Sequence, residues 1–439
     1  MTRPLRRRAP GALLLYHFAP PDAGTIMDHV SAFTRFSRFP VWAVNVGGGY
    51  PPALDRFDPA VMILHYSLFG SATYPIPPRI LGFLDGSRAY KIAFFQDEYH
   101  YRPQRIAFLN DHAIDCVYTL VQPAYHELVY GAASSVRRIV TVIPGYVDDR
   151  MVRLGARWAK LDAGRRIDIG YRARRLPAHW GRGAQEKAEI GERFLEFARG
   201  TDLTLDIDVD NSSRIYGTGW YRFLGDCRSV LGVESGVSVF DMDDSIRLGT
   251  EALLAENPRM GFDELSDRLL SPFEGKLPYR TISPRHFEAA ATRTVQILFE
   301  GEYSGILEPM RHYIPLKKDF GNFDDVLIRY RDIDLRHDLT HRAYVDLVAS
   351  GIYTYQQFIG GVDEVMAESV GGLSRGRQRP IGLALSISQA PGMLRFRLRL
   401  AARRLAHGAW KRLPVAARDF LRPAVRRVLR ATIHRRRVP

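Results

Sequence analysis

The sequence predicts an α/β fold of two successive doubly wound domains, each with a parallel sheet covered by helices on both faces. Apolar strand-like runs recur along the chain at intervals that leave room for helices between them. These runs are continuously apolar, as strands buried on both faces are. A stretch without such runs divides them into two sets, and 439 residues suit two domains with additions.

The first domain is expected over residues 1–150. Its strand-like runs are 11–18, 41–46, 60–67, 90–98, 116–121 and 138–145. Between the first two runs, one helical face is indicated by Ile26, Val30, Phe33 and Phe36. Residues 151–165 lack a strand-like run and are interpreted as a linker. Ligands of doubly wound sheets bind beyond the carboxyl ends of the strands, so the residues after each run are candidates for a site.

The second domain is expected over residues 166–345. Its strand-like runs are 166–172, 203–209, 229–234, 294–301 and 312–316. A polar helical segment at 243–276 breaks the alternation and is interpreted as an insertion. Further helices are expected over 346–372, followed by a basic tail over 373–439.

The net charge of +14 is a property of the tail. From residue 375 to the end there are 18 Lys/Arg and one acid, which leaves the rest of the chain at −3. A nucleic-acid surface over the whole protein is therefore not expected. Cationic and apolar residues alternate over 391–437, which favours an anionic membrane surface as partner; a solvated run or a nucleic-acid arm is the alternative. Pro391, Pro414 and Pro423 are expected to divide the tail into short pieces.

The predicted location is cytoplasmic, peripheral on the inner face of the plasma membrane. The two cysteines, Cys116 and Cys227, lie in separate strand-like contexts and can form neither a disulfide framework nor a paired-cysteine metal site. No apolar run approaches the roughly 20 residues that cross a bilayer. The short run that follows the N-terminal arginines is interpreted as a strand rather than a signal peptide.

The most informative motif is a helix start at residue 283. Ser283 suits the N-cap, because its hydroxyl can accept from unpaired amides, and Pro284 suits the first helical position. Arg285 and Glu288 follow on one face. The amides and the arginine favour phosphate oxygens, and the carboxylate can accept from ribose hydroxyls. This start is predicted to bind a nucleoside diphosphate, with an ordinary surface ion pair as the alternative.

A basic, glycine-punctuated loop after the run 166–172 is a second candidate for the diphosphate. Glycines let the backbone approach a phosphate, and cationic side chains can neutralise it. The candidates are Arg172, Arg174 and Lys187. A basic surface loop without a ligand is the alternative.

Side chains at strand ends are the candidates for catalysis. In the second domain, Ser235 and Gly236 form a loop directly after one of them. A carboxylate or histidine there could orient an acceptor hydroxyl or act as a base, although a lone strand-end acid is more often structural. The four candidates are Glu234, Asp97, Glu98 and His65.

No metal site is predicted. The sequence has no cysteine cluster. Asp206, Asp208 and Asp210 alternate along one strand, which indicates a wet strand face rather than a cation site.

The stretch 283–291, Ser-Pro-Arg-His-Phe-Glu-Ala-Ala-Ala, resembles glycosyltransferases of the GT-B fold, as do Glu234-Ser235-Gly236 and the two doubly wound domains. The matching pattern is Ser-x-Arg-x-Phe-Glu-Ala-x-Ala of the spore-maturation-protein-like branch, related to the family-four enzymes. The likeness covers roughly residues 11–370. It implies two Rossmann-like domains, a nucleotide-sugar donor held by the second, and last helices that cross back to the first.

The resemblance also implies roles for particular residues. Glu288 would hold the ribose, Arg172 and Lys187 the diphosphate, and Glu234 would lie near the sugar. The family-four pattern has a glutamate where this chain has Arg280, so Glu234 would be that glutamate displaced by the insertion.

Taken together, the sequence predicts a metal-independent glycosyltransferase of hexosyltransferase type, with the nucleotide sugar as substrate and no cofactor. The acceptor is expected to be a glycan or a lipid-linked glycan in surface polysaccharide synthesis. Two alternatives stay open: a nucleotide-sugar epimerase of the same fold, and a non-catalytic polyanion-binding protein.

Overall fold

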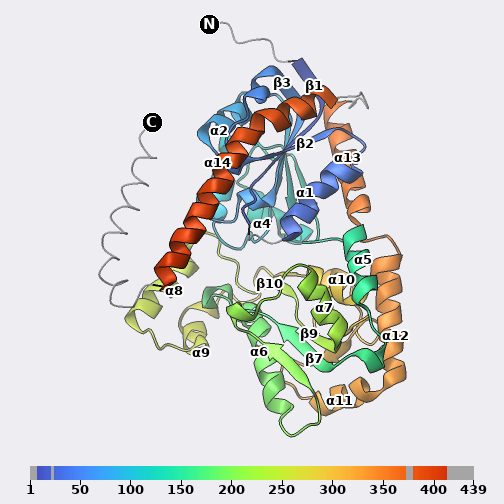
Figure 1. Ribbon diagram of the computed structural model, residues 1–439. Helices are drawn as coiled ribbons and strands as arrows, with labels where there is room; N and C mark the ends of the chain where they lie inside the picture. The colour runs from blue at the N-terminus through green and yellow to red at the C-terminus, as the bar shows by residue number, and fades with distance from the viewer. Residues whose placement is uncertain (1–6, 21–23, 372–378, 413–439) are drawn as a thin grey trace.

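The computed structural model describes residues 7–20, 24–371 and 379–412. It contains two parallel sheets in separate halves of the molecule (Figure 1), so the predicted fold class is confirmed. The part of the predicted tail from 413 onwards lies outside the described residues.

The first half is a six-stranded sheet in the order β2-β1-β3-β4-β5-β6, with every neighbouring pair parallel. Its strands are β1 (Arg7–Tyr16), β2 (Val41–Asn45), β3 (Phe57–Leu64), β4 (Tyr90–Phe94), β5 (Cys116–Thr119) and β6 (Arg138–Thr141). Its helices are α1 (Gly24–Phe36), α2 (Pro78–Asp85), α3 (Arg102–Asp111) and α4 (His126–Tyr130). Successive residues of β1 enter different clusters, with Leu13 and Leu15 on one face of the sheet and Ala12 and Leu14 on the other.

The second half is a five-stranded parallel sheet in the order β13-β12-β9-β7-β8. Its strands are β7 (Ile167–Arg172), β8 (Leu205–Asp208), β9 (Cys227–Gly232), β12 (Val295–Phe299) and β13 (Ile314–Leu316). Its helices are α6 (Arg182–Phe197), α7 (Thr218–Asp226), α10 (Pro284–Ala291), α11 (Phe323–Arg331) and α12 (Ile333–Tyr344). A short antiparallel pair, β10 (Ser235–Val237) with β11 (Tyr279–Thr281), flanks the segment 243–276, which contains α8 (Ser245–Glu256) and α9 (Phe262–Leu265).

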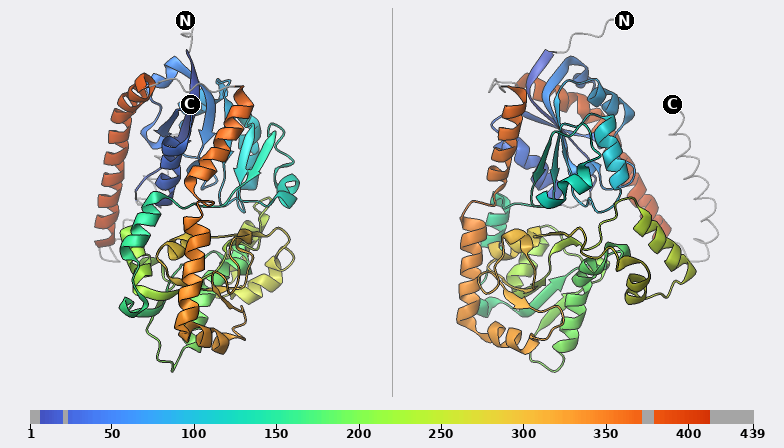
Figure 2. Two further views of the ribbon diagram at one scale, coloured as in Figure 1. Left: turned by 90° about the vertical axis from the view of Figure 1, so that its right-hand side faces the viewer. Right: turned by 180° about the vertical axis from the view of Figure 1, so that it is seen from behind.

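The chain crosses between the halves twice, at adjacent places. The first crossing leads into α5 (Asp149–Trp158), which occupies most of the stretch interpreted as a linker. The second leads into α13 (Tyr355–Val370), which returns to the first sheet and packs there through Phe358, Ile359 and Val362 (Figure 2). The two crossings pair through Val147, whose amide donates to the Tyr353 carbonyl at 2.8 Å and whose carbonyl accepts from the Tyr355 amide at 3.0 Å.

The described part of the tail is one helix, α14 (Arg379–Arg412), with Pro391 inside it. The expectation that Pro391 divides this part into pieces is therefore wrong. An internal proline costs about 3 kcal/mol in an exposed helix, but α14 is packed against the first half. Phe396 lies directly against Gly47, and the Gln389 side-chain amide donates to the Asn45 carbonyl at 2.9 Å. This packing offsets the local cost of the proline.

Candidate active site

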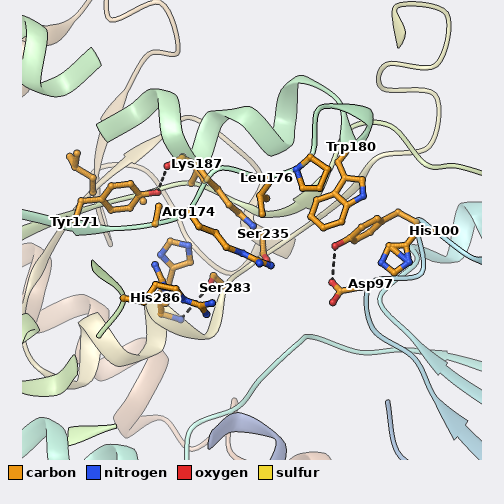
Figure 3. Close-up of a pocket in the computed structure, with 18 of the residues that line it drawn as sticks. Asp97, His100, Tyr171, Arg174, Leu176, Trp180, Lys187, Ser235, Ser283 and His286 are labelled. Carbon is orange, nitrogen blue, oxygen red and sulfur yellow. Dashed lines mark hydrogen bonds between the residues drawn. The ribbon is translucent and has the colours of Figure 1, made fainter. Parts of the chain in front are cut away.

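A cavity of about 640 Å³ lies between the two halves and is lined from both sides (Figure 3). From the first half it is lined by the loop after β4, including Asp97 and His100. From the second half it is lined by residues that follow β7 and β9 and by the start of α10. Both sheets thus contribute residues beyond the carboxyl ends of their strands, where doubly wound folds bind ligands.

Cationic side chains gather on the second-half wall of the cavity. Arg174 follows β7, Lys187 lies in α6 and Arg285 lies in the first turn of α10. Burial, together with the charges of neighbouring arginines, lowers the pKa of Lys187 to about 8, while the charge of Asp97 acts in the opposite direction. A group of cations that destabilise one another in this way has a strong preference for an anionic ligand.

The start of α10 opens toward the same wall. Ser283 is the N-cap, and its Oγ accepts from the Arg285 amide at 3.4 Å. The guanidinium of Arg285 lies over the ring of Trp220 at 5.0 Å and donates to the Arg172 carbonyl. Ser283, Arg285 and Trp220 all line the cavity. The capped helix end and its arginine can therefore reach an anion bound there.

Arg172, unlike Arg174, does not line the cavity. Its guanidinium donates to the Asp206 carboxylate at 2.6 Å and to the Asp206 carbonyl at 2.7 Å, and it lies over the ring of Phe223 at 4.6 Å. These contacts link β7 to β8. Arg172 is the last residue of β7 and its side chain is held against β8, whereas Arg174 lies beyond the end of the strand.

Glu288 lies behind the cavity wall rather than in it. Its Oε2 accepts from the indole Nε1 of Trp220 at 2.6 Å. The carboxyl lines a separate cavity of about 30 Å³ together with Asp28, Arg150 and Tyr221. Burial raises the pKa of Glu288 to about 7. In this arrangement Glu288 orients Trp220, which itself lines the main cavity.

Glu234 and Ser235 are neighbours in the chain but face different cavities. Ser235 lines the main cavity, whereas Glu234 lines another of about 720 Å³ with Arg280 and Glu186. Glu234 accepts from the Tyr303 amide at 3.0 Å and from Arg280 Nε at 3.4 Å.

Gly236, the next residue, has φ of +97° and passes so close to the Tyr279 carbonyl that no side chain would fit. Its role is to let β10 and β11 approach each other.

Of the four residues predicted for catalysis, Asp97 lines the cavity. It has a left-handed backbone, with φ of 55°, and its carboxylate accepts from the Tyr99 hydroxyl at 3.1 Å. Arg105, which is 2% exposed, holds this loop by donating to the carbonyls of Asp97, His100 and Phe69. A strained non-glycine backbone that is fixed by a buried arginine is typical of functional loops.

Glu98 and His65 are buried away from the cavity. Glu98 is 2% exposed and accepts from the hydroxyls of Thr119, Tyr130 and Tyr279. His65 is fully buried, with its Nε2 3.0 Å from His29 Nδ1, and burial lowers its pKa. Strand-end position predicted a site for both, but their side chains form internal polar networks.

Several residues of the cavity wall were not candidates in the sequence. His286, next to Arg285, is 3% exposed, and its Nδ1 is 2.7 Å from Gln296 Oε1. Burial lowers the pKa of His286 to about 4, so it is neutral near pH 7. Trp180 and His100 face each other across the halves, with ring centroids 6.0 Å apart. A tryptophan inside the basic, glycine-punctuated loop was the signal that could have indicated Trp180.

Within the ranges described above, no group of His, Cys, Asp and Glu is arranged to hold a metal ion. In the aspartate series, Asp206 pairs with Arg172, and Asp208 accepts from the Asp210 amide at 2.7 Å.

No protein-family model and no curated protein matches the chain. Solved structures show a distant likeness. HepE from Anabaena, in complex with UDP-glucose, is 10% identical over 82% of this chain and 99% of that chain, with a TM-score of 0.42. Sucrose-phosphate synthase from Thermosynechococcus elongatus is 9% identical over 83% of this chain and 100% of that chain, with a TM-score of 0.44.

A glycosyltransferase from Rickettsia africae is 10% identical over 83% of this chain and 99% of that chain, with a TM-score of 0.43. Likeness at this level assigns neither family nor ligand. The residues of the cavity therefore have to carry the assignment of function, and the spore-maturation-protein-like branch stays a prediction.

Proposed function

We propose that the protein is a glycosyltransferase that binds a nucleotide-sugar donor in the cavity between its halves and transfers the sugar to an acceptor. The observation that carries this proposal is the pairing of two walls. Arg174, Lys187 and Arg285 lie on one side with the capped start of α10, and Asp97 lies on the other side in the loop after β4.

The cationic wall suits the diphosphate of the donor. In the reaction, the bond between the anomeric carbon and the diphosphate oxygen breaks, and the diphosphate leaves with the electron pair. Fixed positive groups and helix amides in a partly enclosed cavity stabilise that developing charge. Lys187, Arg174 and the α10 amides would do this without a metal ion.

The opposite wall suits the acceptor. Asp97 would accept a hydrogen bond from the attacking hydroxyl, whose oxygen forms the new bond to the anomeric carbon and whose proton passes to the carboxylate. Closure of the two halves would exclude water from the reacting centre. The contact between Tyr99 and Asp97 would keep the carboxylate pointed into the cavity.

Three residues implied by the resemblance would act indirectly. Arg172 and Glu234 form internal ion pairs, so they would position the loops that bear Arg174 and Ser235. Contact between Glu288 and a ribose would require the Trp220 indole to leave the carboxylate that it now donates to. Glu288 is thus proposed as a positioning residue whose partner is Trp220.

The acceptor is proposed to be a glycan or lipid-linked glycan, with a hexosyl group as the transferred sugar. The protein would act in the cytoplasm, peripheral on the inner face of the plasma membrane.

A thermal-shift screen with UDP-, GDP-, ADP- and dTDP-sugars tests the proposal. One donor class should raise Tm, because a ligand that binds only the folded state stabilises it. The Lys187→Ala and Arg174→Ala variants should lose most of this shift. The matched control Arg199→Ala, which changes an exposed arginine just beyond α6 that does not line the cavity, should keep it. Absence of any nucleotide-dependent shift would favour a polyanion-binding protein, and turnover without an acceptor would favour an epimerase.

A further inference from the structure

The outward face of α14 carries a stripe of exposed apolar side chains. Its members are Leu383, Ile387, Leu394, Leu398 and Leu405, which are 63%, 64%, 60%, 60% and 76% exposed. They alternate at separations of four and seven residues, which keeps them on one side of a helix. Isolated exposed leucines are common on protein surfaces, but a continuous row along one helix marks an interaction surface.

The opposite face of α14 is already occupied. Leu385 is 4% exposed and belongs to the core of the first half. Met393 lies against Gly48, and Phe396 lies against Gly47 and 5.8 Å from the ring of His17. The helix runs along the outside of the first half (Figures 1 and 2). The side chains of the stripe are exposed. The stripe is therefore not the face that attaches α14.

Arginines border the stripe. With about 3.6 residues per turn, Arg395 lies on one side of it and Arg397 and Arg404 lie on the other, and α14 contains no acidic residue. In the sequence that follows, residues 413–439 add eight Lys/Arg and one acid. An apolar row between arginine borders is complementary to a surface that is apolar inside and anionic outside.

We propose that the outer face of α14 docks on an anionic lipid bilayer. The helix would lie in the plane of the interface, with Leu394 and Leu398 among the acyl chains and the arginines at the headgroups. In the described ranges, no helix is long and apolar enough to cross a membrane. Docking would fix the first half, which carries Asp97, beside the bilayer.

A second copy of the chain fits this surface less well. Separations of four and seven residues also occur in coiled-coil seams. Two copies of α14 would, however, bring arginine borders against arginine borders with no carboxylate between them. Charge complementarity thus selects the bilayer over self-association.

Vesicle co-sedimentation of the full-length chain tests this proposal without any nucleotide. The chain should bind vesicles of phosphatidylcholine with phosphatidylglycerol, and binding should fall by at least tenfold on phosphatidylcholine alone or at high salt. The double variant Leu394→Glu, Leu398→Glu should lose binding by at least tenfold. Ile328→Glu, which changes an apolar residue of α11 that is 68% exposed, should bind like the parent.

The outcomes separate docking by α14 from binding by residues 413–439 and from self-association. Equal pelleting of the double variant and the parent would overturn the proposal and assign any binding to residues 413–439. If light scattering gives the double variant a different mass from the parent while vesicle binding is unchanged, the proposal is wrong and the stripe binds a second copy of the chain. If the double variant keeps the donor-induced thermal shift, it is folded. If the parent does not bind vesicles, the docking proposal is wrong, but the proposed transfer reaction is unaffected.

Discussion

Lys187 is a cation of the cavity wall whose charge changes not far above neutral pH. Burial, with the nearby charges of Arg280, Arg285 and Arg174, lowers its pKa to about 8. Affinity for a nucleoside diphosphate should therefore fall as pH rises from 7 to 9, because the ammonium group is lost from the binding wall. Isothermal titration with UDP, GDP, ADP and dTDP across this range would measure the effect.

Lys187→Arg is the matched control, because a guanidinium stays charged at pH 9. Its affinity should vary little with pH, and that of Lys187→Ala should be about tenfold or more weaker at pH 7. A wild-type affinity that is constant up to pH 9 would contradict the placement of Lys187 at the diphosphate.

Glu288 should make stability depend on pH. Its pKa is raised from 4.5 to about 7, so between these values the folded protein holds a proton that the unfolded chain has released. Stability is then lost as pH rises from about 4.5 to 7, and the loss is complete above 7.

Glu288→Gln removes this dependence while keeping an oxygen for Trp220. Relative to the parent, the variant should gain on the order of 1 kcal/mol between pH 5 and pH 8, since each unit of pKa shift corresponds to about 1.4 kcal/mol and the side chain is partly exposed. Urea unfolding at both pH values would measure it. A parallel pH dependence of the two proteins would show that Glu288 is ionised throughout.

At the scale of elements, the positions of the strands were predictable and the directions of side chains were not. Continuous apolar runs locate a buried strand, so β2, β4 and β5 each begin at the residue where the predicted run begins. Whether a residue near a strand end lines the cavity depends on whether it lies within or beyond the strand and on its partners elsewhere in the chain. The Glu234 carboxylate pairs with Arg280, and the Arg172 guanidinium pairs with Asp206. Their neighbours Ser235 and Arg174 line the cavity.

The continuity of α14 also could not be predicted from the sequence. The low helix propensity of proline predicted a break in the helix at Pro391. The sequence alone does not reveal that Gly47 and Gly48 of the first half leave room for Phe396 and Met393, and this packing keeps α14 continuous. The apolar stripe is the outer face of α14 because the opposite face of the helix is packed against the first half.

The loop after β4 depends on Arg105. This arginine donates to three carbonyls, and two of them belong to the residues Asp97 and His100 that line the cavity. Arg105→Ala should cost about 2–3 kcal/mol, because buried carbonyls lose a charged donor, and it should reduce transfer more than donor affinity. Chemical unfolding, donor titration and transfer assays would separate these effects. Equal losses in donor affinity and in transfer would contradict a role specific to the acceptor side.

At the scale of the whole molecule, the two crossings between the halves determine how the cavity can work. They pair at Val147 and Thr354, on one side of the boundary, where they can act as a hinge. Across the gap the halves also meet through Asp244, whose carboxylate accepts from the Tyr101 amide at 3.2 Å and from the Gln104 side chain at 2.9 Å. Donor binding in the cavity would favour closure of the halves around it, which brings the loop 97–101 against the bound donor, and release of the diphosphate would favour opening.

Hydrogen exchange with and without a saturating nucleotide sugar tests the central claim most directly, because it reports on both walls at once. Binding in the cavity should slow amide exchange in the loop 97–101, in the segment 173–187 and at the start of α10, with little change in α11 or β8. Unchanged exchange in these three segments, with protection elsewhere or nowhere, would contradict the assignment of the cavity as the donor site.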